Sequence, residues 1–350
     1  MSGAKELRLG VVGLGFGANH ARVLSELDGV CLAAVCDSDA DRLAAAARGR
    51  RLAAYADYGE MLRNERLDAV VVAVPAHLHA PVALAAIDAG CALLVEKPLA
   101  PSVGEARRIV AAAEQAGVAL MAGHIERFNP AVAELVRRVR AGEAGRVLQV
   151  SARRLAYFRE APREVDVGVI HDLALHEIDM MRFVLGVEVE RAYAETQGNV
   201  RTPFDDSVSA VLRFHAAGGP GAVGYLEVNW LSPSKVRELS VLGERGQFVI
   251  DYEAQALAFQ PAQAVEAGAK PAGSAPASVW VHGGAPRAAA SIPIARREPL
   301  ASELAAFVAA VRDGAPMPVT GADALAALAV ADALAESGRT GAPVRPRLEP

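Results

Sequence analysis

The chain has 350 residues, 52% of them hydrophobic and 22% charged, with a net charge of −5 at pH 7. This composition is too apolar for a disordered protein, and the length allows two domains with cores of their own. The charge lacks the basic excess that binding to a polyanion favours, so we expect no nucleic-acid partner.

Up to residue 124, short apolar runs alternate with helical patterns, which is typical of a parallel, doubly wound sheet. We therefore predict an α/β Rossmann domain over residues 1–123. The run at 68–75 is rich in valine, as expected for a strand buried on both faces. Strands are predicted at 8–13, 30–37, 68–75, 91–98 and 118–124, and helices at 18–27, 38–48, 79–90 and 102–117.

The first strand runs into a G-x-G-x-x-A motif that begins at Gly13 and includes Gly15, Phe16, Gly17 and Ala18. Glycines allow a tight turn and a close approach of the backbone to a pyrophosphate, which the N–H groups of the helix N-terminus then bind. The motif alone is weak, and the alternative is an ordinary turn between strand and helix. Its place between the first strand and helix of a βαβ unit favours dinucleotide binding.

Asp37 ends the second strand, 24 positions after Gly13. A carboxylate there accepts hydrogen bonds from the adenosine ribose and repels a 2′-phosphate, so we predict NAD rather than NADP. Arg42, on the next helix, is a cofactor-binding candidate that softens this preference. An alternative role for Asp37, compatible with the first, is to cap that helix.

Lys97 closes the strand at 91–98 in the sequence Glu96-Lys97-Pro98, and it is one of only four lysines in the chain. Carboxyl ends of parallel strands face the ligand crevice, so Lys97 is expected at the nicotinamide end of the cleft. A partly desolvated amine there is suited to proton transfer. Pro98 is a candidate for a cis peptide bond that directs Lys97.

Beyond residue 123 the pattern changes, and strands dominate. We predict an α+β domain with a mostly antiparallel sheet over residues 124–350, with a flexible excursion at 261–290 that is rich in Ala, Gly, Pro and Ser. Helices are predicted at 128–142, 171–186, 300–313 and 321–337, and strands at 147–157, 190–200, 206–214, 222–230, 236–243 and 246–252.

Asp172, His176 and Asp179 have the spacing that places them on one face of a helix. A histidine flanked by carboxylates is a plausible general base. The alternative is a structural histidine in a capped helix, but the Rossmann domain and the strand-end lysine favour a catalytic role. His171 and His176 are five residues apart and face different ways, so we expect no zinc site.

Lys235 follows Trp230 in a segment between two strands of the second domain. With the nearby Arg237, it suits the diphosphate of a nucleotide sugar. The alternative is a hairpin with solvated cations and a tryptophan in the core.

Neither secretion nor membrane insertion is indicated, so we expect a cytoplasmic protein. The three cysteines form no Cys-x-x-Cys pair, and their odd number argues against a disulfide framework. The N-terminal sequence lacks the apolar stretch and cleavage site of a signal peptide. No uninterrupted apolar run reaches the roughly 18 residues that span a membrane.

Over nearly its whole length the sequence resembles the Gfo/Idh/MocA family of oxidoreductases. The resemblance rests on GLGFGANHARVL, VVVAVPAHLHAPVALAAIDAG, LLVEKPLA, GHIERFNP and DLALHEIDMMRFVLG. It implies the catalytic set Lys97, Asp172 and His176. It implies cofactor contacts from Gly13, Gly15, Ala18, Asp37, Pro75, His79, Glu96 and Lys97, and substrate contacts from Lys97, Arg127, Tyr157, His176 and Lys235.

Two departures stand out, since Ala76 replaces a common Asn and residues 166–171 lack a Gly-Gly-Gly run. Within the family, three segments look most like UDP-N-acetylglucosamine 3-dehydrogenases: GHIERFNP, DVGVIHDLALHEID and NWLSPSKVRELSVLGERG. The likeness implies NAD-dependent oxidation of the C3 hydroxyl to a ketone. His176 would act as base, Lys97 would stabilise the alkoxide and Asp172 would orient both, and the roles of His176 and Lys97 are exchangeable.

The exact substrate stays open. Alternatives are UDP-N-acetylglucosaminuronate and inositol or a simple sugar. Two other functions remain as alternatives. One is that of a non-catalytic dinucleotide sensor, in which the Lys or the His is typically lost. The other is reduction of an imine or tetrapyrrole. The resemblance also implies a homodimer or homotetramer formed through the C-terminal sheet, because an exposed apolar sheet face needs cover.

Overall fold

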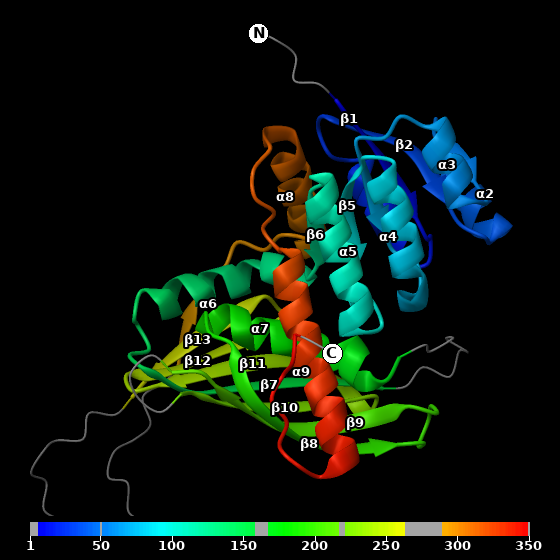
Figure 1. The fold of residues 1–350 in the computed structure, drawn as a ribbon. Coiled ribbons are helices and arrows are strands. Elements are labelled where there is room, and N and C mark those ends of the chain that lie inside the picture. The colour runs from blue at the N-terminus through cyan, green and yellow to red at the C-terminus, as the bar shows by residue number, and fades with distance from the viewer. Residues whose placement is uncertain (1–5, 50, 158–166, 217–220, 263–288, 349–350) are drawn as a thin grey trace, which may run out of the picture.

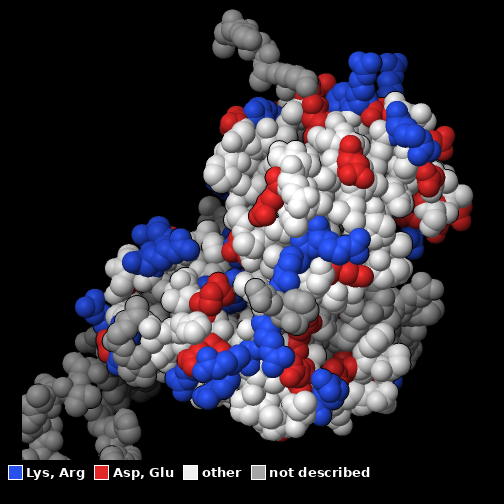
Figure 2. Space-filling model, in the orientation of Figure 1, with Lys and Arg blue, Asp and Glu red and all other residues white. Residues whose placement is uncertain are grey.

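The computed structural model describes residues 6–49, 51–157, 167–216, 221–262 and 289–348. Two sheets, each covered by helices, make up the molecule (Figure 1). Basic and acidic side chains are interspersed over the described part of the face in Figure 2. No helix among the described residues is long and apolar enough to cross a membrane.

The first sheet is fully parallel and has the strand order β3-β2-β1-β4-β5-β6. This is the doubly wound order, with the switch point between β1 and β4, so the predicted fold class is confirmed. The strands are β1 (Leu7–Val12), β2 (Val30–Cys36), β3 (Ala53–Tyr55), β4 (Ala69–Val72), β5 (Ala92–Glu96) and β6 (Leu120–Gly123). The helices are α1 (Gly17–Leu24), α2 (Ala40–Ala47), α3 (Tyr58–Asn64), α4 (His79–Asp88) and α5 (Val103–Ala116), with the 3₁₀ turn η1 (Ala76–Leu78).

Sequence patterns explain most of these elements. The side chains of β4 are completely buried, as an unbroken valine run in a central parallel strand requires. Ser102 caps α5, and Gly117 ends it in the left-handed region. The hydrophobic periodicity of the sequence did not predict β3 and α3, because β3 has only three residues and α3 buries only Met61.

The second sheet has the order β14-β13-β12-β11-β7-β10-β9-β8 and is antiparallel except for the β10–β7 pair. This confirms the predicted mostly antiparallel sheet. Its strands are β7 (Val147–Tyr157), β8 (Val189–Gly198), β9 (Asp205–Phe214), β10 (Val223–Asn229), β11 (Leu231–Gly243), β12 (Gly246–Asp251), β13 (Ala256–Pro261) and β14 (Ala290–Ile292). Most of the predicted excursion at 261–290 lies outside the described residues.

Helices cover one face of this sheet, between it and the first sheet (Figure 1). They are the 3₁₀ turn η2 (Ile125–Phe128), α6 (Pro130–Arg140), the π-helical turn η3 (Ile170–Ala174), α7 (Leu175–Leu185) and α9 (Gly321–Thr340).

The last two helices tie the two parts together. Helix α8 (Pro299–Asp313) packs on α1 and η2, and its Leu304 and Phe307 belong to the first hydrophobic core. Helix α9 contributes Leu328 to the first core and Leu334 to the second. The predicted division into residues 1–123 and 124–350 stays a prediction. Residues of α8 and α9, which follow the second sheet in the chain, pack in the first hydrophobic core.

Candidate active site

The glycine-rich loop after β1 has the geometry of a dinucleotide cradle. Gly13 has a φ of +90°, and a Cβ there would lie 2.6 Å from the carbonyl oxygen of Ala73. A Cβ on Gly17, the first residue of α1, would lie 3.1 Å from a side-chain atom of Val11. A Cβ on Gly15 would meet nothing closer than Arg42 Nη1, at 3.9 Å. The helix N-terminus is therefore open above the loop, which suits a pyrophosphate. The exposed residues beside it are Gly15, Phe16 and Ala18.

Asp37 lies directly under this loop. Its Oδ2 accepts a 2.5 Å hydrogen bond from the Leu14 N–H, and its Oδ1 accepts one of 2.9 Å from the Asp39 N–H. Arg42 Nη1 is 3.7 Å from Oδ2. The alternative capping role falls to Asp39 instead, which accepts the N–H groups at the start of α2. Asp37 and Arg42 thus flank the position expected for the adenosine ribose.

His79 joins the segments that follow β4 and β5. Its ring nitrogens lie 2.9 Å from the carbonyl oxygen of Val74 and 2.7 Å from that of Pro98. The Lys97–Pro98 peptide bond is cis, as the sequence suggested. Pro75 is exposed at the end of the β4 segment. The buried His79 thus fixes both segments below the expected nicotinamide position.

Lys97 connects the two parts of the molecule. Its Nζ donates to Asp172 Oδ1 and to the Asp172 carbonyl oxygen, each at 2.8 Å. Asp172 lies in the π-helical turn η3, a distortion that often marks functional sites. Residues 75 positions apart are thereby brought together at the carboxyl end of β5, as expected for a ligand crevice.

His176, on the first turn of α7, is held in its neutral form by its surroundings. Its Nδ1 is buried and has no hydrogen-bond partner among the described residues. Burial lowers the pKa of His176 well below its ordinary value, and the charges of Lys97 and Arg154 lower it further. The imidazole is therefore neutral near pH 7, which is the form that a general base needs.

Two arginines lie near His176: Arg154, which was not predicted as a site residue, and Arg237, which the sequence offered only as a neighbour of Lys235. Arg154 is buried on the core face of β7, where it forms ion pairs with Glu126 at 2.7 Å and Glu177 at 2.5 Å. Arg237 stands opposite Arg154 in the β11–β7 register. Its Nη1 donates to two main-chain carbonyls, and no carboxylate among the described residues lies within ion-pair distance. The sequence did contain a signal for Arg154. In the alternating pattern of β7, Arg154 occupies an inward-facing position, where an apolar residue is normally found.

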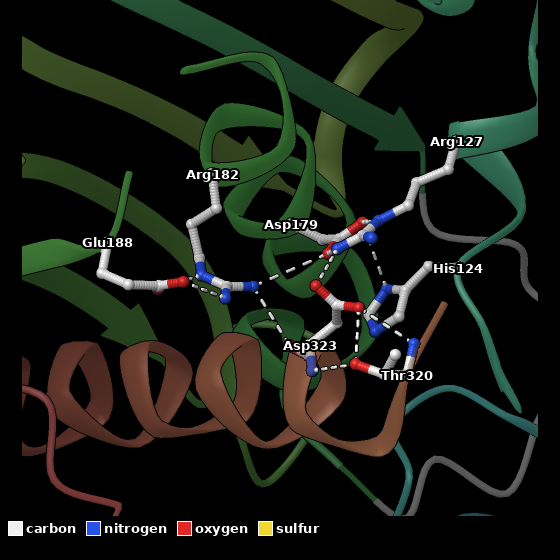
Figure 3. A network of polar contacts seen from close by, with 7 residues as sticks. All are labelled: His124, Arg127, Asp179, Arg182, Glu188, Thr320 and Asp323. Carbon is white, nitrogen blue, oxygen red and sulfur yellow. Dashed lines mark hydrogen bonds and ion pairs between the residues drawn. The ribbon is translucent and has the colours of Figure 1, made fainter. Parts of the chain in front are cut away.

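Arg127 is held in an interior network rather than beside Lys97 (Figure 3). It donates two hydrogen bonds, of 2.8 and 2.6 Å, to the fully buried Asp179 and a third, of 3.1 Å, to Asp323. Arg182 and His124 each lie 3.7 Å from Asp179. Asp179, expected on the same helix face as His176, thus directs its carboxylate to Arg127.

The remaining substrate candidates lie at the periphery. Tyr157 is half-exposed at the end of β7. Lys235 is exposed and forms an ion pair with Glu253, while Trp230 is buried in the second core. The structure brings Lys97, Asp172 and His176 together, but it does not add Lys235 or Arg127 to that group, and all these substrate roles stay predictions.

Comparison with known proteins identifies the family. Residues 7–124 match the model of an oxidoreductase family with an NAD-binding Rossmann fold, and residues 132–249 match the GFO/IDH/MocA C-terminal domain. The chain belongs to the Gfo/Idh/MocA family. The predicted family and the NAD-binding domain are thereby confirmed.

Relatives of known activity differ in their substrates. The chain is 38% identical over 190 residues to inositol 2-dehydrogenase 4 of Saccharopolyspora erythraea, which covers 53% of this chain and 56% of that protein. It is 34% identical over 183 residues to UDP-N-acetylglucosamine 3-dehydrogenase of Acidithiobacillus ferrooxidans, covering 52% and 55%. These matches thus span little more than half the length of either relative.

A solved structure of the Acidithiobacillus enzyme aligns over 95% of this chain and 97% of its own, with a TM-score of 0.79 and 26% identity. The similarity in fold therefore extends over both parts of the molecule.

Proposed function

We propose that the chain is an NAD-dependent dehydrogenase that oxidises a secondary hydroxyl of a sugar or polyol to a ketone. The observation that carries this proposal is the strand-end Lys97, hydrogen-bonded to Asp172 beside a neutral His176. A non-catalytic dinucleotide sensor would not need these three groups at the carboxyl end of β5.

In this proposal His176 accepts the hydroxyl proton as the bond from carbon to oxygen becomes a carbonyl. Lys97 donates a hydrogen bond to the oxygen on which negative charge develops. Asp172 keeps the ammonium group of Lys97 in place through two contacts. NAD, when bound, would supply the acceptor for the hydride that leaves the same carbon. Gly13, Gly15, Gly17 and Asp37 would hold that cofactor, because the open helix N-terminus and the carboxylate fit its pyrophosphate and ribose.

We further propose an anionic sugar as substrate, with UDP-N-acetylglucosamine oxidised at C3 as the first candidate. Arg237 supports this choice, since it is partly buried near His176 and has no carboxylate partner among the described residues. A guanidinium in that position suits a phosphate or carboxylate of the ligand. The similarity to the Acidithiobacillus enzyme supports the same candidate.

The test is NADH formation with UDP-N-acetylglucosamine, UDP-N-acetylglucosaminuronate, myo-inositol and glucose. If the proposal is right, a nucleotide sugar has the highest kcat/KM, and Arg237→Gln raises its KM several-fold while leaving turnover of neutral polyols unchanged. Glu238→Gln, at the exposed neighbouring position of the same strand, serves as the matched control. Equal effects of Arg237→Gln on neutral and anionic substrates would refute the anionic site.

The second candidate is an inositol dehydrogenase. The relatives named inositol 2-dehydrogenase favour it, with identities of up to 38%. A preference for myo-inositol over both nucleotide sugars in the same panel would establish it and would leave the dehydrogenase proposal intact.

We also propose that a second copy of the chain packs on the outer face of the second sheet. Val211, Tyr225 and Val249 are each more than two-fifths exposed there, and Tyr225 pairs with Val211 in register. Apolar side chains gathered on one sheet face favour association. Light scattering should give the mass of a dimer or tetramer, and Tyr225→Asp should lower it.

A further inference from the structure

A cluster of three ionisable side chains lies buried directly behind Lys97. His20 comes from α1, Glu96 from the end of β5 and Glu303 from α8. One nitrogen or oxygen from each lies within 4.8 Å of the others. His20 and Glu303 are fully buried, and Glu96 is nine-tenths buried. The proposed reaction assigns no role to His20 or Glu303.

Their polar atoms lack partners elsewhere in the described residues. Both ring nitrogens of His20 and both carboxylate oxygens of Glu303 make no hydrogen bond, and neither does Glu96 Oε1. His20 Nε2 lies 3.1 Å from Glu96 Oε1, close enough for an ion pair. Buried polar groups are normally satisfied, so these three side chains must satisfy one another or share a ligand.

Charge balance decides how they do so. Two ionised carboxylates at this separation in the interior would repel strongly, whereas one proton between them removes the repulsion. Among the described residues, the titratable groups that face Glu303 are His20 from α1, Glu96 from β5 and Glu126 from η2. Burial, and then the charges of Glu96 and Glu126, raise the pKa of Glu303 well above its ordinary value. Burial alone would raise the pKa of Glu96, but His20 and Lys97 outweigh it and leave that pKa lowered.

We propose that Glu303 keeps a proton and donates it in a hydrogen bond to Glu96, so that His20, Glu96 and Glu303 form one unit that positions Lys97. The link to Lys97 is direct, because Glu96 Oε2 accepts the Lys97 main-chain N–H at 3.1 Å. The link to the cofactor loop runs through α1, which begins at Gly17 and carries His20. Glu303 is therefore a positioning residue that acts through Glu96.

Glu303→Gln and Glu303→Ala test this unit, with Glu114→Gln on the exposed face of α5 as control. Glutamine replaces a protonated carboxyl with another donor, so Glu303→Gln should keep kcat within about twofold of the wild type at pH 7. Alanine leaves Glu96 without its donor, and kcat should fall about tenfold or more while the Kd for NAD changes less. If glutamine restores no more activity than alanine, the proton on Glu303 is refuted.

A second experiment, in which melting temperatures are measured as a function of pH, needs no substrate. A carboxyl whose pKa is raised on folding gives stability that is lost as pH rises above its unfolded value of roughly 4.3. Glu303→Gln has no such proton to lose. The wild type should therefore lose stability relative to Glu303→Gln as pH rises from about 4 to 8, whereas the stability of Glu114→Gln should change with pH in parallel to that of the wild type. A difference that is constant with pH, or that grows the other way, overturns the proposal.

Infrared spectra and elemental analysis complete the test. The wild type at pH 8 should show a carbonyl band of a protonated carboxyl group, and Glu303→Gln should lack it. Absence of that band in the wild type, or one equivalent of a divalent metal in the wild type but not in Glu303→Gln, would overturn the proposal. The kinetic measurements rest on the proposed dehydrogenase activity. The melting and infrared measurements do not, so a failure of this proposal can be told apart from a failure of the proposed function.

Discussion

Replacing Arg127 by methionine should destabilise the protein strongly and leave substrate binding nearly unchanged. The reason is the interior network of Figure 3, in which Arg127 gives two hydrogen bonds to a carboxylate with no solvent exposure. Removing one partner of a buried ion pair costs about 3–5 kcal/mol, because the other charge stays buried. Arg182, 3.7 Å from Asp179, offsets part of that cost, so we expect the lower end of the range.

The assay is thermal unfolding alongside Michaelis kinetics. For a chain of 350 residues, with an unfolding entropy of about 2.1 cal/mol/K per residue, a loss of about 3 kcal/mol corresponds to a melting temperature lower by roughly 4 °C. The matched control is Glu244→Gln, which breaks an exposed ion pair with Arg146 and should change the melting temperature little. The double variant Arg127→Met/Asp179→Leu removes both charges and should be more stable than Arg127→Met. A tenfold rise in KM without a change in melting temperature would refute this reasoning and restore Arg127 as a substrate residue.

Three further predictions concern the site. Lys97→Ala and His176→Ala should each lower turnover by about 10² or more while NAD still binds, since general acid–base groups contribute about 10²–10⁴. Fluorescence titration with NAD measures whether the cofactor still binds. Near-wild-type rates in both variants would rule out catalytic roles for Lys97 and His176. The wild type should prefer NAD to NADP by about tenfold in kcat/KM because we expect Asp37 to face the 2′-position, and Asp37→Asn should narrow that ratio. Equal use of both cofactors by the wild type would contradict the role given to Asp37. The acid limb of kcat/KM should lie below the ordinary histidine value of roughly 6.5, because the base must be neutral and the pKa of His176 is lowered. A limb above that value, or one unchanged in His176→Ala, would argue against His176 as base.

Local patterns were sufficient for the fold class and for the group around Lys97. Strand–helix alternation predicted the parallel sheet, and the rule that ligands bind at carboxyl ends of parallel strands predicted a ligand site around Lys97, which directly follows β5. The spacing of Asp172 and His176 put both on one helix segment. The structure adds that Asp172 contacts Lys97 directly from a π-helical turn. That distortion leaves no periodic signal in so short a segment.

Long-range partners were not predictable from such patterns. Arg127 reaches Asp179 across 52 positions and Asp323 across 196. Periodicity assigns a side chain to a face but does not say which distant side chain meets it. The same limit hid the packing of α8 on the first core, because an apolar helix near the C-terminus fits either core equally well as a pattern.

Lys97 is fixed from both sides of the junction between the two parts of the molecule. Its main chain is held by Glu96 within the first part, and its side chain is held by Asp172 from the second. The network of Arg127, Asp179 and Asp323 ties α7 to the start of α9. A shift of one part against the other would therefore move Asp172, which holds the ammonium group of Lys97, relative to the backbone anchor of Lys97 at Glu96. Catalytic geometry in this chain should accordingly be sensitive to changes in the contact between Lys97 and Asp172, and turnover is the measurement that reports such changes.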